Sequence, residues 1–162
     1  MVDLDQYRER SLATWDRIAD NWAQEREFFW AHTQPVSRRL IERLGAQPGE
    51  TVLDVACGTG DTGFLAAREI GPEGMLIASD FSPEMVARAR ENARVQGVEN
   101  ADFRILDAEA MELPDDSIDR VVCRWGYMLM ADPLRALRET RRVLRDGGRL
   151  AFAVWAAPQE NE

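Results

Sequence analysis

Val52-Leu53-Asp54-Val55-Ala56-Cys57-Gly58-Thr59-Gly60 is the stretch that decides the fold of this chain. An apolar run carrying one carboxylate leads into a glycine turn, which predicts a buried strand followed by a loop that closely approaches a ligand. A carboxylate is costly to bury alone, so Asp54 is predicted to have a partner. The stretch therefore predicts a nucleotide-type cofactor site.

Downstream of this stretch, short apolar runs alternate with helical patterns, as in βα units around a parallel sheet. Turn sequences rich in glycine, proline and aspartate separate these units, including residues 71–74, 114–116 and 146–148. The predicted strands are 51–56, 75–79, 102–106, 118–124 and 149–155, and the predicted helices between them are 61–70, 83–96 and 133–145.

The N-terminal part has a different pattern. Apolar residues recur at spacings of three, four and seven over residues 3–31, which predicts a helix, and a second helix is predicted over 35–45, ending at Gly45. We therefore expect a helical cap over 1–46 and an α/β domain over 47–162.

The composition of the chain argues against several classes of function. The chain has 162 residues and a net charge of −9, which argues against nucleic acid as the main partner. It contains no apolar run long enough for a membrane span. His32 is the single histidine, and Cys57 and Cys123 lack metal-ligand spacing, so no metal site is expected. With no recognisable secretory signal, a reducing cytoplasm is the default location.

Four features are predicted to lie at the carboxyl ends of strands, where doubly wound sheets bind ligands. The glycine turn opens a helix whose N-terminus favours an anionic group. Asp80 ends the second strand, where a carboxylate can accept both hydroxyls of a ribose. After the third strand, Asp107 and the backbone of Ala108 can bind an adenine edge. Residues 124–128 follow the fourth strand and would border the reacting end of the cofactor.

The glycine pattern leaves an alternative open. Residues 58–63 also satisfy G-x-G-x-x-G, the dinucleotide fingerprint, and Asp80 stands where an NAD ribose ligand would. Two observations favour a methyl donor instead. Asp54 interrupts a strand that usually runs apolar into the first glycine, and Asp107-Ala108 supplies a second acidic loop that a dinucleotide site does not require.

Taken together, residues 50–155 resemble the class I S-adenosylmethionine-dependent methyltransferases, in the broad group that includes the ubiquinone and menaquinone C-methyltransferases. The resemblance covers about two-thirds of the chain. It rests on four stretches: residues 52–60 match the first motif, with Ala56 in place of its first glycine; Asp80-Phe81-Ser82 matches the acidic second motif; Asp107-Ala108-Glu109 matches the adenine loop; and residues 144–150 resemble the turn into the fifth strand.

The resemblance implies an enzyme that transfers a methyl group from S-adenosylmethionine to a small-molecule acceptor. The implied fold is a Rossmann-like doubly wound parallel sheet in the order 3-2-1-4-5 with an N-terminal helical cap. The implied donor-binding residues are Asp54, Ala56, Gly58 and Gly60 at the methionine part, Asp80 on the ribose, Phe81 and Met85 beside the adenine, Asp107 and Ala108 at its edge, and Arg124 near the reacting end.

Several of these residues also have a purely structural interpretation. Trp15 and Trp22 can close over donor or acceptor, although plain packing is the favoured reading for both. Met85 can equally be a helix core residue, and Asp107 can be an ordinary turn residue. The sequence singles out neither the acceptor nor a general base; His32, Tyr127 and Asp132 are candidates for the base.

The chain stops shortly after the predicted fifth strand, whereas the family continues through two more. We therefore expect either a fragment or a shortened natural variant with an open sheet edge at 149–155, which leaves a homodimer open. Donor binding is expected to survive, since its motifs precede residue 130. Two other classes remain: an NAD-linked oxidoreductase, and a module that binds the donor without catalysis.

Overall fold

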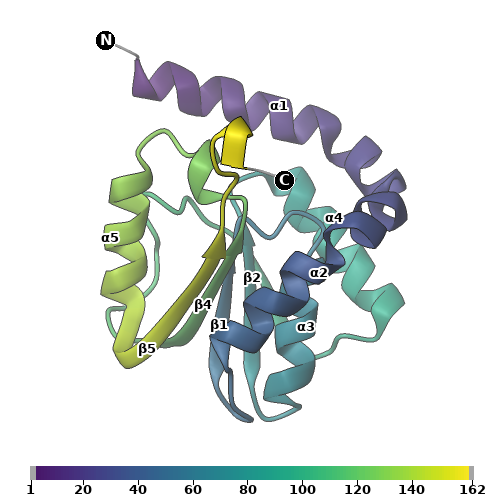
Figure 1. Cartoon of the computed structure of the whole chain (residues 1–162), viewed down its shortest axis with the longest axis vertical. Coiled ribbons are helices and arrows are strands. Elements are labelled where there is room, and N and C mark those ends of the chain that lie inside the picture. Colours follow the sequence, from purple (N-terminus) through teal and green to yellow (C-terminus); the bar gives the residue numbers. More distant parts are fainter. Residues whose placement is uncertain (1–2, 161–162) are drawn as a thin grey trace.

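The computed structural model describes residues 3–160 (Figure 1). Helices and strands alternate through the α/β part, in the order that the sequence predicts. The elements are α1 (Leu4–Gln24), α2 (Arg26–Leu44), β1 (Thr51–Val55), α3 (Asp61–Ile70), β2 (Met75–Asp80), α4 (Pro83–Gln96), β3 (Ala101–Ile105), β4 (Ile118–Arg124), the 3-10 turn η1 (Tyr127–Leu129), α5 (Pro133–Val143), β5 (Leu144–Ala153) and the 3-10 turn η2 (Pro158–Glu160).

The five strands form one sheet in the order β3-β2-β1-β4-β5, and every pairing is parallel. This confirms the predicted doubly wound topology. The chain moves outward from β1 through β2 to β3, and then returns to the other side of β1 with β4. The switch point, where such sheets bind ligands, therefore lies at the carboxyl ends of β1 and β4.

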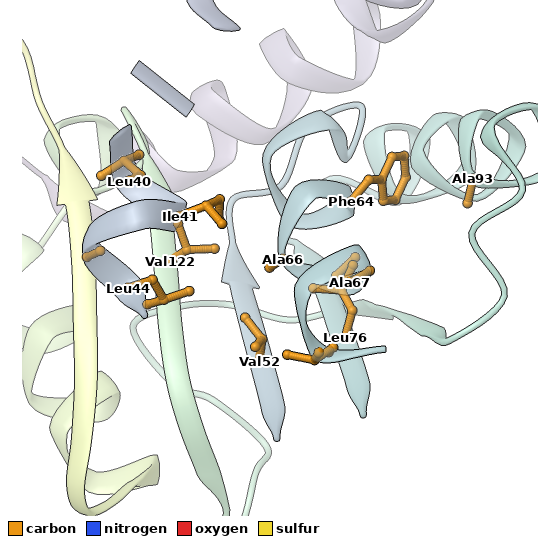
Figure 2. Packing of buried hydrophobic residues seen from close by; sticks show 13 residues of the cluster. Leu40, Ile41, Leu44, Val52, Phe64, Ala66, Ala67, Leu76, Ala93 and Val122 are labelled. Carbon is orange, nitrogen blue, oxygen red and sulfur yellow. The ribbon is translucent and has the colours of Figure 1, made fainter. Parts of the chain in front are cut away.

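The two faces of the sheet bury alternate residues of each strand. Val52 of β1 and Val122 of β4 belong to a core cluster with Leu40, Ile41 and Leu44 of α2 and Phe64 of α3. In Figure 2 the three α2 side chains gather around Val122, and Phe64 lies farther along the cluster, near Ala93. On the opposite face, Leu53 and Val121 pack with Ala136 and Val143 of α5. Because side chains alternate along a strand, Asp54 lies on the α3 face, between two residues of the other cluster.

The N-terminal helices differ from the prediction. α1 ends at Gln24 and α2 begins at Arg26, so the break falls near Glu25 and not between residues 31 and 35. Pro35 lies inside α2, where a proline removes one backbone hydrogen bond. Packing of Leu40, Ile41 and Leu44 on the sheet holds α2 together despite this loss. The turn near Glu25 lets α1 cross the carboxyl ends of the strands while α2 lies on the sheet face (Figure 1).

The end of the sheet also differs. α5 stops at Val143, and β5 already begins at Leu144. The predicted turn at 146–148 is therefore an irregularity within β5: Leu144 pairs with Ile118 and Arg149 with Arg120, with extra residues between them. Gly147 has a φ of 79°, which lets the strand accommodate this bulge.

The division into a 1–46 cap and a 47–162 domain stays a prediction. α2 shares a core cluster with the sheet and α3, while α1 contacts mainly α4. Among residues 3–160, no helix is long and apolar enough to cross a bilayer.

Candidate active site

A pocket of about 560 Å³ opens at the switch point of the sheet. Its floor is formed by the carboxyl ends of β1, β2 and β4, one wall by the loop after β3, and its roof by α1. Nine of the ten predicted donor-binding residues line it: Asp54, Ala56, Gly58, Asp80, Phe81, Met85, Asp107, Ala108 and Arg124. Gly60 is not in the lining; it is buried at the N-terminus of α3.

Asp54 has the partners that its burial requires. The backbone N–H of Gly63 in α3 donates to its Oδ2 over 2.9 Å. Burial raises the pKa of Asp54 to about 7, and the nearby positive charge of Arg124 opposes this rise. Asp54 therefore changes its charge near neutral pH, unlike an ordinary surface aspartate.

Arg124 is the positive group on the pocket floor. Its Nη1 donates to the hydroxyls of Thr33 at 2.6 Å and Ser37 at 3.1 Å, both on α2. Burial lowers the pKa of Arg124, while the carboxylates of Asp54 and Asp61 raise it. α2 thus fixes the guanidinium at the end of β4 and keeps it in the field of Asp54.

Asp80 ties the glycine turn to the end of β2. Its Oδ2 accepts the backbone N–H of Gly58 at 3.0 Å, and its Oδ1 accepts that of Ser82 at 3.1 Å. Asp80 is only 6% exposed, and this burial raises the pKa of its carboxyl group. A carboxylate has about four acceptor positions. Two positions therefore remain for hydroxyl groups of a ligand in the pocket.

The floor of the pocket contains two residues with left-handed backbone. Ala56 has a φ of 55° and Trp125 a φ of 63°, which is strained for a bulky side chain. They follow β1 and β4, and Gly126, next to Trp125, packs tightly against Ala56: an ideal Cβ at Gly126 would lie 2.7 Å from Cβ of Ala56. The close fit of these two turns holds the Trp125 side chain at the pocket, where its ring stacks on Trp155 with centroids 4.9 Å apart.

The aromatic residues Trp15 and Trp22 of α1 form part of the pocket roof. Trp15 and Trp22 line the pocket and also pack edge-to-face on each other, with centroids 5.8 Å apart. Packing and pocket-lining therefore coincide. Tyr7 and Arg8 at the start of α1 line the pocket as well, and sequence reasoning missed both. No local pattern marks them as pocket residues, because the contacts that place them there, Tyr7 with Leu129 and Arg8 with Glu109, join residues more than 100 positions apart.

The loop after β3 combines a turn with a pocket wall. Oδ1 of Asp107 accepts the backbone N–H of Glu109 at 2.8 Å, so Asp107 is a turn residue as well as a lining residue. Glu109 is buried and lines the pocket too. Sequence reasoning assigned it no role.

The family assignment rests on comparison with known proteins. The family model described as "Methyltransferase domain" matches residues 46–161, well over half of the chain. The chain belongs to this family.

Related methyltransferases agree with this membership. The chain is 42% identical over 113 residues to an arsenite methyltransferase from Halobacterium salinarum, covering 68% of this chain and 29% of that protein. It is 39% identical over 123 residues to a demethylmenaquinone methyltransferase from Listeria welshimeri, covering 75% and 51%. It thus spans about half or less of these two relatives.

Solved structures agree on the fold. The crystal structure of a SAM-dependent methyltransferase from Aquifex aeolicus superposes with a TM-score of 0.71 at 26% identity, covering 78% of this chain and 67% of that one. The predicted Rossmann-like class and the resemblance to S-adenosylmethionine-dependent methyltransferases are confirmed. The pocket of this methyltransferase domain lies where its fold binds ligands.

None of the candidate bases lines the pocket. His32 bonds through Nδ1 to the carbonyl oxygen of Phe28, Tyr127 is buried with its hydroxyl 2.6 Å from that of Thr140, and Asp132 caps α5 by accepting the N–H of Arg135. In the described part of the chain, no cluster of three or more histidine, cysteine or acidic residues could hold a metal ion.

Proposed function

We propose that this methyltransferase domain binds S-adenosylmethionine in the switch-point pocket and transfers its methyl group to a small-molecule acceptor. The observation that carries the proposal is the convergence in one pocket of nine residues that the family motifs assign to the donor. Family membership decides against the NAD-linked alternative. Donor binding without catalysis remains the second candidate, and turnover on an acceptor separates the two.

In this proposal, each part of the donor meets a different strand end. The methionine part lies at Ala56 and Gly58, near Asp54 and Arg124. Gly60 is buried behind this turn and shapes it without lining the pocket. Asp80 accepts the ribose hydroxyls with its two remaining acceptor positions. The adenine lies between Phe81 and Met85, with its edge at Asp107 and Ala108.

Little further chemistry is required of the side chains. A sulfonium donor supplies an already activated methyl group, so the residues chiefly align the acceptor and exclude water. Orientation alone can contribute roughly 7–11 kcal/mol to lowering a barrier. Leu12 and Trp15 of the roof, together with Met128, provide an apolar surface that excludes water from the reacting atoms.

We propose an uncharged, largely apolar acceptor. Outside the donor residues, the lining includes the apolar side chains Leu12, Trp15, Met128, Leu129 and Trp155. It also includes Arg8 and Glu109, which form an ion pair with each other, and Glu9. An arsenic acceptor would favour thiolate ligands. Among the described residues, Cys57 is the one cysteine in the lining, and burial raises the pKa of its thiol well above the ordinary value. This environment supports an organic acceptor better than arsenite.

The remaining expectations belong to the same proposal. The net charge of −9 supports a small-molecule acceptor and no nucleic-acid partner. The reduced state of Cys57 and Cys123 fits a cytoplasmic location. A homodimer is part of the same proposal, and exposed Phe152 of β5 offers an apolar contact for it.

Thermal unfolding with S-adenosylmethionine, S-adenosylhomocysteine and NADH in parallel tests donor binding. A ligand at 100 times its dissociation constant stabilises the folded state by about 2.7 kcal/mol. For a domain of this size we expect the unfolding temperature to rise by roughly 5–10 °C with the two sulfur compounds. A rise with NADH alone would contradict the proposal. Transfer of a labelled methyl group to a panel of phenolic acceptors then separates catalysis from binding alone.

Donor affinity should depend on pH through Asp54. Its pKa in the free protein is about 7. The cationic amino group of the donor favours the ionised carboxylate, so binding releases a proton below pH 7, and affinity rises with pH and levels off above it. From pH 6 to pH 8 we expect about a tenfold gain for S-adenosylhomocysteine, as one titrating group allows.

Calorimetry at the two pH values measures this gain, and Asp54→Asn is the control. Asparagine keeps an oxygen that can accept the Gly63 N–H, and it does not titrate. The difference between the two proteins cancels the titration of the ligand itself. An equal pH dependence in both would rule out Asp54 as the titrating group.

A further inference from the structure

Glu109 connects three walls of the pocket. Glu109 is 4% exposed and lies on the loop after β3. Its Oε1 accepts the backbone N–H groups of Ala131 at 2.9 Å and Asp132 at 3.1 Å, just before α5. Its Oε2 forms an ion pair with Arg8 of α1, in which Nε donates over 3.1 Å and Nη2 donates as well. The donor wall, the 131–132 loop and the roof therefore meet at one carboxylate.

The contacts of Glu109 depend on the position of the loop after β3, to which Glu109 belongs. A buried carboxylate keeps its charge only with good hydrogen-bond partners, and losing one partner is costly. The backbone N–H of Glu109 is held by Asp107, one of the residues proposed to bind the adenine edge. A ligand that orders Asp107 and Ala108 therefore also orders Glu109, and through it Arg8.

The two ends of α1 are attached differently. Its C-terminal half is fixed to α4: Asp16 accepts the hydroxyl of Ser82 at 2.5 Å, and Asp20 pairs with Arg88 at 2.8 Å. Its first turns lie over the pocket, where Arg8 reaches Glu109 and the hydroxyl of Tyr7 donates to the carbonyl oxygen of Leu129 at 3.0 Å. The N-terminal half can therefore open while the C-terminal half stays attached.

We propose that Glu109 is a positioning residue that couples donor binding to closure of the roof over the acceptor. When the adenine orders residues 107–109, Glu109 holds Arg8 and the 131–132 loop, and the acceptor side is completed only after the donor is in place. This inference rests on the proposed function, because it requires a donor at Asp107 and Ala108. Arg8 acts through Glu109 and needs no contact with the donor.

Hydrogen exchange of the folded protein with and without S-adenosylhomocysteine tests the coupling. We expect the ligand to slow exchange about tenfold or more in two regions: the glycine turn at 52–60, and residues 5–12 of α1. In Arg8→Gln, the protection at 52–60 should persist while that at 5–12 is lost. Arg8→Lys should restore it in part, since lysine keeps the charge without the two-nitrogen contact.

Two further variants make the test specific. Glu109→Gln keeps one oxygen for the N–H groups of Ala131 and Asp132 but removes the ion pair, so it should behave as Arg8→Gln does. Arg10→Gln is the matched control, because Arg10 lies on the same helix and bonds to Gln6. It should retain full protection at residues 5–12.

The outcomes separate the coupling from the proposed function. Protection at 52–60 without any change at 5–12 in the unaltered protein would overturn the coupling alone. Equal protection of 5–12 in Arg8→Gln and Arg10→Gln would also overturn it. No protection at 52–60 in the unaltered protein would overturn the proposed donor site itself.

Discussion

Asp80→Ala is expected to weaken the binding of S-adenosylhomocysteine by at least about 100-fold, the largest effect on affinity among our predictions. Hydrogen bonds to a charged group contribute about 1.5–3 kcal/mol each. Losing two bonds to ribose hydroxyls therefore removes about 3 kcal/mol or more, which corresponds to roughly 100-fold. Isothermal titration calorimetry measures the change directly.

The same substitution should also destabilise the protein. The N–H groups of Gly58 and Ser82 lose their acceptor, and an unsatisfied buried donor costs about 1–3 kcal/mol. Urea unfolding measures this cost, so binding is compared under conditions where the variant is folded. Asp102→Ala is the control: Asp102 is a half-exposed carboxylate on β3 that pairs with Arg104. If Asp80→Ala bound S-adenosylhomocysteine as tightly as the unaltered protein does, Asp80 would not be a ribose ligand.

Gly60→Ala is expected to give the largest loss of stability, about 2–5 kcal/mol. Gly60 has a φ of 86°, where alanine is strained by about 1–2 kcal/mol. An ideal Cβ there would also lie 2.8 Å from Cε1 of Phe64 and closer still to its Cζ. The Phe64 ring is fully buried, and such overpacking costs typically 1–3 kcal/mol.

Gly49→Ala separates strain from clash. Gly49 has nearly the same φ, 84°, and an added Cβ would meet nothing within 4 Å. It should therefore lose only the strain contribution, about 1–2 kcal/mol. The difference between the two variants in urea unfolding measures the contact of Gly60 with Phe64. Equal losses would show that the ring moves aside without cost.

Two features explain why the β-sheet and its ligand edge were predictable. Capping signals such as Ser82-Pro83 and Asp132-Pro133 act within one helical turn, and the structure has both: the Ser82 hydroxyl accepts the Met85 N–H and the Asp132 carboxylate accepts the Arg135 N–H. The alternation of short apolar strands with helices dictates a parallel sheet, whose carboxyl ends lie on one edge. Asp54, Asp80 and Asp107 follow or end such strands, so they meet in one pocket.

The bend between the N-terminal helices was not predictable from local pattern. Apolar periodicity continues through Glu25, and Pro35 signals a helix start in sequence terms. The observed break depends instead on which elements α1 and α2 pack against: α4 for the first, and β4, β5 and α3 for the second. These surfaces exist only when the sheet has formed, which is why tertiary packing outweighs a local proline signal here.

The sequence by itself determined the alternation of strands and helices and the edge of the sheet where the glycine turn and the acidic residues gather, because periodicity, capping and glycine turns act between residues close together in the chain. The strand order and the family came from the resemblance of these motifs to the class I methyltransferases. Only the tertiary structure decided that Arg8 meets Glu109, that Thr33 of α2 holds Arg124, and that Trp155 stacks on Trp125. Arg8 and Glu109 lie 101 positions apart in the chain, and Thr33 and Arg124 lie 91 positions apart. Trp125 and Trp155 follow two different strands, β4 and β5. Long-range charge and ring contacts follow from how the elements pack, and no spacing in the sequence encodes them.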